Sequence, residues 1–248
     1  MYHSLEGKIA LVTGSSRGIG RAIAEGLAAH GAAVVVNYVG NEKAAQEAVA
    51  AIRENGGKAV AIQADISSVS DIRRLFDETE KQMAAIDIVV ANVGVAVIKP
   101  LVEATEADFD HVFGANAKGT FFTLQEAARR VRDGGRIIAV STGGTKMFFT
   151  QTALYLGSKG AVEQFVRVLS RELGPRSVTV NALSPGFTDT DLASAAGSRD
   201  RRRDVALRQD RSAARRCRCR GFPRLRRGPL ADRREHPGRR RRCLVNSE

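Results

Sequence analysis

Tyr155 and Lys159 are the two residues of this sequence best suited to moving a proton together. They stand four positions apart in the segment YLGSK, near the start of an expected helix, so both side chains project from one face. A free tyrosine, with a pKa of about 10, transfers its proton poorly at neutral pH. A nearby ammonium group stabilises the phenolate, so we expect Lys159 to lower the pKa of Tyr155 toward the working range. The pair is a candidate proton donor for the oxygen of a carbonyl group whose carbon receives a hydride.

Ser141 directly follows a short apolar run, 136–140, that is typical of a buried strand. Its hydroxyl can hydrogen-bond the same substrate oxygen and orient it, a modest contribution of the oxyanion type. Each of the three residues also has a plain interpretation, as an exposed tyrosine, a solvated lysine and a serine that ends a strand. Their combination favours a catalytic set.

These residues need a scaffold, and the sequence alternates short apolar runs with longer helical patterns. The apolar runs have the length of strands buried on both faces of a parallel sheet, at 9–12, 33–36, 59–62, 86–90, 136–140 and 178–183. The helical patterns cover 18–30, 41–55, 69–83, 105–132 and 151–173. The alternation predicts an α/β fold: a single Rossmann-type, doubly wound parallel sheet with helices on both faces and a binding site at the carboxyl ends of the strands.

The first expected strand runs into a glycine-rich segment, TGSSRGIG at 13–20, that opens directly into a helix. Glycines let the backbone approach a pyrophosphate, which the amide groups and dipole of the helix then hold. An ordinary strand-to-helix turn is the alternative, but the strand before and the helix after favour cofactor binding. The residues assigned to this site are Gly14, Ser16, Arg17, Gly18, Ile19 and Gly20.

The G-x-x-x-G-x-G spacing of this turn, with the Tyr155 and Lys159 pair, resembles the short-chain dehydrogenase/reductase family, and above all its 3-oxoacyl-carrier-protein reductases. The resemblance extends from Leu5 to about Leu192. It implies an NAD(P)-dependent oxidoreductase that transfers a hydride between NADP(H) and a ketone or secondary alcohol. It also implies that Lys159 holds the nicotinamide ribose and that Asn116 is an active-site residue. Asparagine is a poor helix former, so its place inside a helical pattern favours such a role.

Further cofactor contacts follow from the resemblance. It implies adenine contacts at Asp65 and Ile66, a backbone turn at Asn92 and Gly94, and nicotinamide contacts at Pro185, Gly186 and Thr188. Two of these assignments have alternatives. The Asp65 carboxylate could instead cap the helix that begins at Val69, and the segment 185–188 could be a simple turn.

The end of the second expected strand bears on the choice between NAD and NADP. An acid there would bond the ribose hydroxyls of NAD, but this chain has Asn37 and Tyr38. Arg17 could bond a 2′-phosphate bidentately, which favours NADP(H), with NAD(H) as the alternative. Arg17 could also be a solvated loop residue.

Substrate and partners are less defined by the sequence. Met147, Phe148 and Phe149 suggest an apolar or aromatic wall for the substrate, although packing or a subunit contact would use the same residues. The family implies a homo-oligomer, either a tetramer or a dimer. No run of about 18 apolar residues and no secretory signal stands in the sequence, so we expect a cytoplasmic protein without a membrane partner. The cysteines all follow residue 216, so no metal site is expected in the body.

The net charge of +12 is concentrated at the end of the chain. Residues 199–248 hold 19 arginines and 6 acids, whereas the preceding residues hold 20 basic and 21 acidic side chains. We therefore expect a dinucleotide-binding catalytic domain over 1–197 and an Arg-rich tail over 198–248 that buries no core. The last helix and strand of the family fold are not recognisable there.

Two explanations of the tail stay open. One is a slip of the reading frame near Gly197. Arginine codons read one base later give Gly, Ala, Val, Asp or Glu, which are the residues that the C-terminal part of the family fold should contain. The shifted readings of residues 205–213, 223–230 and 232–241 can resemble family C-terminal segments, in the right order. A genuine basic arm is the other, which would make the chain a catalytically impaired dinucleotide-binding protein whose tail binds nucleic acid or another anionic partner.

Overall fold

The expected parallel sheet is present in the computed structural model, which describes residues 5–147, 149–186 and 188. In these residues six strands form one sheet in the order β3-β2-β1-β4-β5-β6, and every neighbouring pair is parallel. The strands are β1 (Ile9–Val12), β2 (Ala33–Tyr38), β3 (Lys58–Gln63), β4 (Ile88–Ala91), β5 (Arg136–Val140) and β6 (Thr179–Leu183). The strand order reverses between β1 and β4, and the carboxyl ends of the strands at such a reversal flank a ligand crevice.

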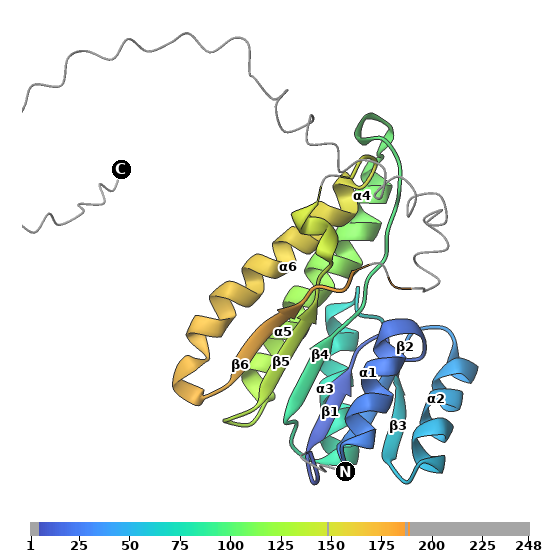
Figure 1. Ribbon diagram of the computed structural model, residues 1–248, viewed down its shortest axis with the longest axis vertical. Helices are drawn as coiled ribbons and strands as arrows, with labels where there is room; N and C mark the ends of the chain where they lie inside the picture. The colour runs from blue at the N-terminus through green and yellow to red at the C-terminus, as the bar shows by residue number, and fades with distance from the viewer. Residues whose placement is uncertain (1–4, 148, 187, 189–248) are drawn as a thin grey trace, which may run out of the picture. The chain divides into compact units, whose positions relative to one another are not determined.

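Helices cover both faces of the sheet (Figure 1). One face carries α1 (Gly18–Ala29) and α2 (Glu42–Glu54), and the other carries α3 (Val69–Met83), α5 (Gly119–Arg130) and α6 (Ala153–Glu172). A short helix, α4 (Glu106–Phe113), precedes α5, and 3-10 turns lie at η1 (Leu101–Glu103), η3 (Gly143–Lys146) and η4 (Gly174–Arg176). The doubly wound architecture expected from the sequence is confirmed.

The alternation of side chains along the strands divides the core into two layers. On β1, Leu11 packs toward α3, α5 and α6, whereas Ala10 and Val12 pack toward α1 and α2. Phe76 is the largest fully buried side chain of the first layer. Because strands buried on both faces need apolar residues at every position, they appear in the sequence as unbroken apolar runs.

The helix expected over 105–132 is present from Glu106 to Arg130, but it is not regular. A π turn, η2 (Gly114–Lys118), separates α4 from α5. π turns contain one residue more than a regular α turn and occur often at functional sites. Gly114, Asn116 and Gly119 are poor helix formers that stand within six residues. This cluster is the signal in the sequence for the interruption.

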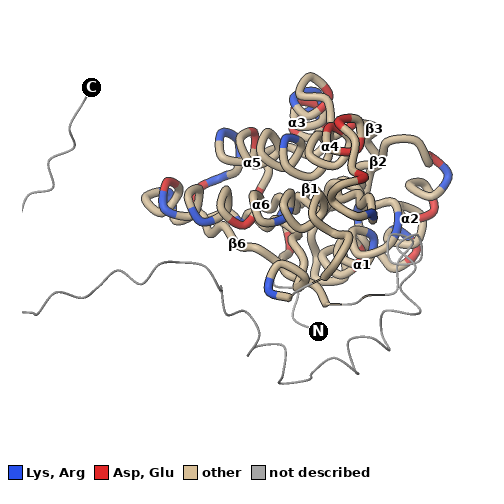
Figure 2. Tube along the Cα trace, turned by 90° about the horizontal axis from the view of Figure 1, so that it is seen from above, with Lys and Arg blue, Asp and Glu red and all other residues tan. Residues whose placement is uncertain are grey.

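Charges of both signs are mixed over the outer helices (Figure 2), as expected for the nearly neutral body. Ion pairs within helices include Arg21 with Glu25 at 2.7 Å and Arg74 with Glu78 at 3.1 Å. No helix in the described part of the chain is long and apolar enough to cross a membrane. The Arg-rich tail, 198–248, and its boundary with the catalytic domain lie outside the described residues.

Candidate active site

The glycine-rich turn between β1 and α1 needs its glycines for two different reasons. Gly14 and Gly18 have φ angles of 60° and 56°, in the left-handed region that side chains disfavour. Gly20 is required by close packing instead. A Cβ atom there would overlap the carbonyl oxygen of Gly14 and would lie 2.5 Å from Nδ2 of Asn92. The turn is therefore a compact backbone cradle in front of the α1 N-terminus, whose first turn holds no acidic residue.

Asn37, assigned from the sequence to cofactor binding, supports this turn from beneath. Its Oδ1 accepts a hydrogen bond from the Gly14 backbone N–H at 3.0 Å. Its Nδ2 donates to the carbonyl oxygens of Tyr38, Ile62 and Ala64 at 3.3, 3.3 and 3.1 Å. The side chain is buried and bonded to the backbone at both polar ends, so it positions the turn.

Asn92 joins the end of β4 to the same turn. Its Nδ2 donates to the carbonyl oxygens of Thr13 and Gly14 at 3.0 and 3.1 Å. The Asn92 backbone N–H donates to Oγ1 of Thr13 at 2.9 Å. Asn92 thus bonds the segment after β4 to the glycine-rich turn.

The remaining residues assigned to the cofactor lie around the cradle. Arg17 is exposed and occupies the N-cap position of α1, without a capping bond from its side chain. Ser16, Ile19 and Tyr38 are partly buried. Ser16, Arg17 and Ile19 follow β1, and Tyr38 ends β2, the strand next to β1 in the sheet.

Asp65 and Ile66 follow β3, and the proposed capping role of Asp65 is wrong. Ser68 is the N-cap residue of α3, because its hydroxyl accepts a hydrogen bond from the Asp71 backbone N–H. The exposed Asp65 carboxylate accepts from the backbone N–H and the hydroxyl of Ser67, both at 2.8 Å. Ile66 is buried and packs against Gly119 at the start of α5.

Lys159 lies at the centre of the candidate catalytic group. Its Nζ donates to the carbonyl oxygen of Val140 at 2.8 Å and to that of Val93 at 3.3 Å. The residue is 2% exposed, and this burial lowers the pKa of its ammonium group from 10.5 to about 8. Gly94 lies beside it, since a Cβ there would be 3.1 Å from Nζ. Lys159 thus connects the ends of β4 and β5.

Tyr155 is one turn earlier on α6 and is partly buried. Burial raises the pKa of its hydroxyl, and a hydrogen bond with the Thr142 side chain opposes this rise only in part. The expected lowering of the Tyr155 pKa by Lys159 is absent in this geometry, because the ammonium group is directed at two backbone carbonyls. The raised pKa keeps the phenol protonated, which is the form that can donate a proton to a substrate oxygen.

Ser141 and Asn116 are both buried beside this group. The Ser141 hydroxyl donates to Oε1 of Glu163 at 2.9 Å, a contact that the sequence reasoning missed. Asn116 donates from Nδ2 to Ser158 Oγ at 2.9 Å and to the Val95 carbonyl at 2.8 Å, and it accepts from the Val95 N–H at 2.8 Å. The π turn thus directs Asn116 at the residue before Lys159, so Asn116 connects α6 to the segment after β4.

The segments expected to line the substrate and nicotinamide sites are described in part. The Gly143 backbone N–H donates to the Pro185 carbonyl at 2.8 Å, which places the segment after β6 against the segment after β5. Thr188 is exposed, and its hydroxyl donates to the Gly186 carbonyl at 3.2 Å. Met147 is exposed and Phe149 partly buried. Phe148 and Phe187 lie outside the described residues.

Comparisons with known proteins show what this chain is similar to. The family model of the short chain dehydrogenases matches residues 8–201. A hydroxynaphthalene reductase-like protein of Metarhizium brunneum is 49% identical over 190 residues, covering 76% of this chain and 71% of that protein. The NADP-bound structure of the angucycline C-6 ketoreductase LanV is 40% identical, with a TM-score of 0.75, covering 79% of this chain and 80% of that one. A putative dehydrogenase of Burkholderia cenocepacia with bound NADP is 36% identical, with a TM-score of 0.76, covering 79% and 75%.

Proposed function

Because the chain belongs to the short-chain dehydrogenase family, it is an oxidoreductase, and we propose that it transfers a hydride between NADP(H) and a ketone or its secondary alcohol. Structures similar to it contain NADP, and relatives are described as reductases. The tight cradle of Gly14, Gly18 and Gly20 fits the pyrophosphate of such a dinucleotide. When bound, the nicotinamide supplies the hydride.

A continuous path of contacts from the cofactor cradle to the proton donor carries this proposal. Asn92 binds the cradle, and Val93, the next residue, accepts from Lys159. Lys159 also binds Val140, which precedes Ser141. Cofactor, proton donor and substrate would therefore meet at the carboxyl ends of β1, β4 and β5.

Each residue of the candidate group has a separate task in the proposed reaction. Tyr155 donates a proton to the carbonyl oxygen as that oxygen gains charge. Lys159 joins the ends of β4 and β5 one turn after Tyr155 and holds the ribose. Ser141 contacts the same oxygen. Asn116 keeps α6 and the segment after β4 in place.

We further propose that the substrate is an aromatic ketone. Two of the similar proteins are a hydroxynaphthalene reductase-like protein and an angucycline ketoreductase. Met147 and Phe149 supply apolar and aromatic side chains in the segment after Ser141. α-Tetralone is a suitable first probe, because it combines an aromatic ring with one ketone.

The function is tested by following NADPH absorbance with a panel of ketones that includes α-tetralone and an aliphatic 3-oxoacyl thioester. Turnover of the bicyclic ketone above that of the thioester is the expected result. Absence of turnover with every ketone, together with nucleic-acid binding that weakens steeply with salt, would instead support an impaired protein with a cationic arm.

Arg17 is proposed to select NADPH over NADH. Replacing Arg17 with Ala removes the guanidinium proposed to bond the 2′-phosphate, so the KM for NADPH should rise about tenfold, the equivalent of one charged hydrogen bond. The KM for NADH should stay within about twofold, since NADH lacks the phosphate. Initial rates with each cofactor give both values. Arg21→Ala is the matched control, because Arg21 pairs with Glu25 on the same helix. Equal changes for both cofactors would contradict the role of Arg17.

We propose that α5 and α6 form the contact between two copies of the chain. An apolar groove of about 370 Å³ lies between these helices, with Phe121 packed edge-on against Phe165 at 5.3 Å. Phe121 and Val168 are 43% and 59% exposed, which is unusual for large apolar residues that lie together. Val168→Glu is expected to convert the oligomer to monomers in sedimentation experiments. Val102→Glu, at a 92% exposed position in η1, should leave the oligomer intact.

The domain arrangement, with a catalytic domain over 1–197 and an Arg-rich tail over 198–248, is likewise a proposal. We favour a reading-frame slip near Gly197 as the origin of the tail. Determining the nucleotide sequence tests this directly, because an unbroken frame that encodes the arginines would refute it.

A further inference from the structure

The start of α6, where Tyr155 lies, has little local support. Ala153 is the first residue of this helix, so Tyr155 belongs to its first turn. Thr152, the N-cap residue, makes no capping hydrogen bond with its side chain, and the first turn holds no acidic residue. The first backbone N–H groups of a helix have no partner within it, so a helix without such a cap frays more easily at this end. A proton donor in this turn needs support from elsewhere in the chain.

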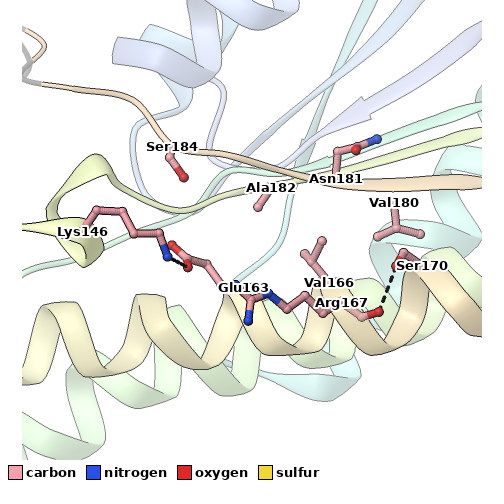
Figure 3. Close-up of a pocket in the computed structure, with 9 residues that line it drawn as sticks. All are labelled: Lys146, Glu163, Val166, Arg167, Ser170, Val180, Asn181, Ala182 and Ser184. Atoms are coloured by element: carbon pink, nitrogen blue, oxygen red, sulfur yellow. Dashed lines mark hydrogen bonds and ion pairs between the residues drawn. The ribbon is translucent and has the colours of Figure 1, made fainter.

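Farther along, α6 is anchored firmly. Lys159 binds carbonyl oxygens at the ends of β4 and β5. Glu163, one turn later, accepts a hydrogen bond from Lys146 Nζ at 2.9 Å, and Figure 3 shows these two side chains directed at each other. Because these anchors follow Tyr155 along the helix, they do not fix the residues that precede it.

Gln151, the residue before the N-cap, is held by a distant segment. Its φ of 64° lies in the left-handed region that residues other than glycine disfavour. Such a conformation persists where surrounding contacts hold it. The carbonyl oxygen of Gln151 accepts a hydrogen bond from the backbone N–H of Lys99 at 3.0 Å. The segment after β4 thus reaches the chain just before α6 begins.

Lys99 is in turn fixed by its side chain. Its Nζ donates to Oδ2 of Asp108 at 2.7 Å, and the two side chains are 31% and 19% exposed. The same oxygen accepts from the backbone N–H and the hydroxyl of Thr105 at 2.9 and 2.7 Å, within the capping box of α4. The bonds from Lys99 and Thr105 hold the pKa of the Asp108 carboxyl well below its ordinary value, so the ion pair is intact at neutral pH.

We propose that Lys99 is a positioning residue for Tyr155. The ion pair with Asp108 fixes the point at which the Lys99 backbone N–H holds Gln151, and Gln151 sets where α6 begins. This inference rests on the proposed function, in which Tyr155 donates the proton. The segment that carries Lys99 is also bonded to Asn116, so it joins the π turn to the start of α6.

Lys99→Met tests the proposal, because methionine keeps the length of the side chain and removes its charge. A shift of about 1 Å in a reacting group can cost a hundredfold in rate, so we expect the smaller displacement of Tyr155 to lower kcat for α-tetralone about tenfold. The KM for NADPH should change less than about twofold, since the cofactor cradle is built on β1 and α1. Lys99→Arg keeps the ion pair and should retain kcat within about threefold of the wild-type value.

Two comparisons separate positioning from a general structural effect. Asp108→Asn keeps an amide oxygen for the cap of α4 but removes the charge, so in this background Lys99→Met should lower kcat less than about threefold. Lys8→Met is the matched control, because Lys8 pairs with Asp87 at 3.1 Å at the opposite, amino ends of β1 and β4. A tenfold loss that persists in the Asp108→Asn background, or an equal loss in Lys8→Met, would overturn the proposal.

A second measurement needs no turnover. Amide hydrogen exchange of the peptide 149–158, followed by mass spectrometry, reports on the first turn of α6. Lys99→Met should speed exchange there about tenfold, the equivalent of one charged hydrogen bond, whereas Lys8→Met should not. Unchanged exchange in Lys99→Met would show that Lys99 does not support the start of α6 and would overturn the proposal. Absence of ketone reduction by the wild-type protein would contradict the proposed function alone, since hydrogen exchange still reports on the Lys99 contact.

Discussion

Replacing Tyr155 with Phe is expected to lower kcat about a thousandfold, within the range found for loss of a positioned general acid. The substitution removes only the hydroxyl that donates the proton and keeps the ring that packs at the start of α6. Binding of NADPH, measured by fluorescence titration, should change less than twofold. The thermal midpoint should stay close to that of the wild-type protein, since the position is only partly buried.

The Tyr155→Phe result also discriminates between mechanisms. Because burial raises the pKa of the Tyr155 hydroxyl, the phenol is protonated at neutral pH and is ready to donate. A variant that retains more than about a tenth of the wild-type kcat would show that water or another residue supplies the proton, since a general acid contributes at least a hundredfold.

Replacing Lys159 with Met is expected to lower kcat at least about a hundredfold, because the ammonium group that joins the ends of β4 and β5 and would hold the ribose is removed, which misplaces the cofactor. It should also change how stability depends on pH. The pKa of Lys159 is about 8 in the folded chain, against an ordinary value of 10.5. The folded state therefore disfavours the charged ammonium group, and this cost is fully present below pH 8. As the pH rises from about 8 to 10.5 the cost disappears.

The size of this pH effect follows from the pKa shift. A lowering from 10.5 to about 8 corresponds to roughly 3 kcal/mol in the free energy of unfolding. Urea unfolding of the wild-type and Lys159→Met proteins over this pH range measures the effect. The contributions of the other titrating groups cancel in the difference between the two free energies of unfolding. As the pH rises from about 8 to 10.5, the free energy of unfolding of the wild-type protein should rise relative to that of the variant. A constant difference would mean that the ammonium group is not buried as described.

The central strands could be predicted because β1 and β4 are buried at every position, whereas β6, which was expected to be buried on both faces, is exposed at four of its five residues. A run such as 136–140 is apolar at all inward positions, and β5 begins and ends where the run does. Lys159 and Ser141 could likewise be placed together, since both stand at ends of elements that meet at the carboxyl edge of the sheet. Periodicity and spacing are local properties, so a sequence displays them directly.

The contacts that the sequence could not reveal are made between distant segments. Asn37 has the polarity of a ligand-binding residue, and only the neighbouring β3 shows that its amide is bonded to the backbone. Glu163 stood at helical spacing after Lys159, which was a usable signal, but its bond to Ser141 depends on how β5 meets α6. The chemical role of such a side chain is decided by its partners.

The π turn at Gly114–Lys118 gives this part of the chain an unusual sensitivity to insertions and deletions. Loss of a single residue there would let α4 and α5 join as one regular helix, in which each residue advances about 100° around the axis. Asn116 would then leave Val95 and Ser158, and the face that α5 presents to the sheet would rotate with it. Length is therefore as constrained as composition in this segment, whereas the exposed turn at η1 can absorb extra residues without changing any helix face.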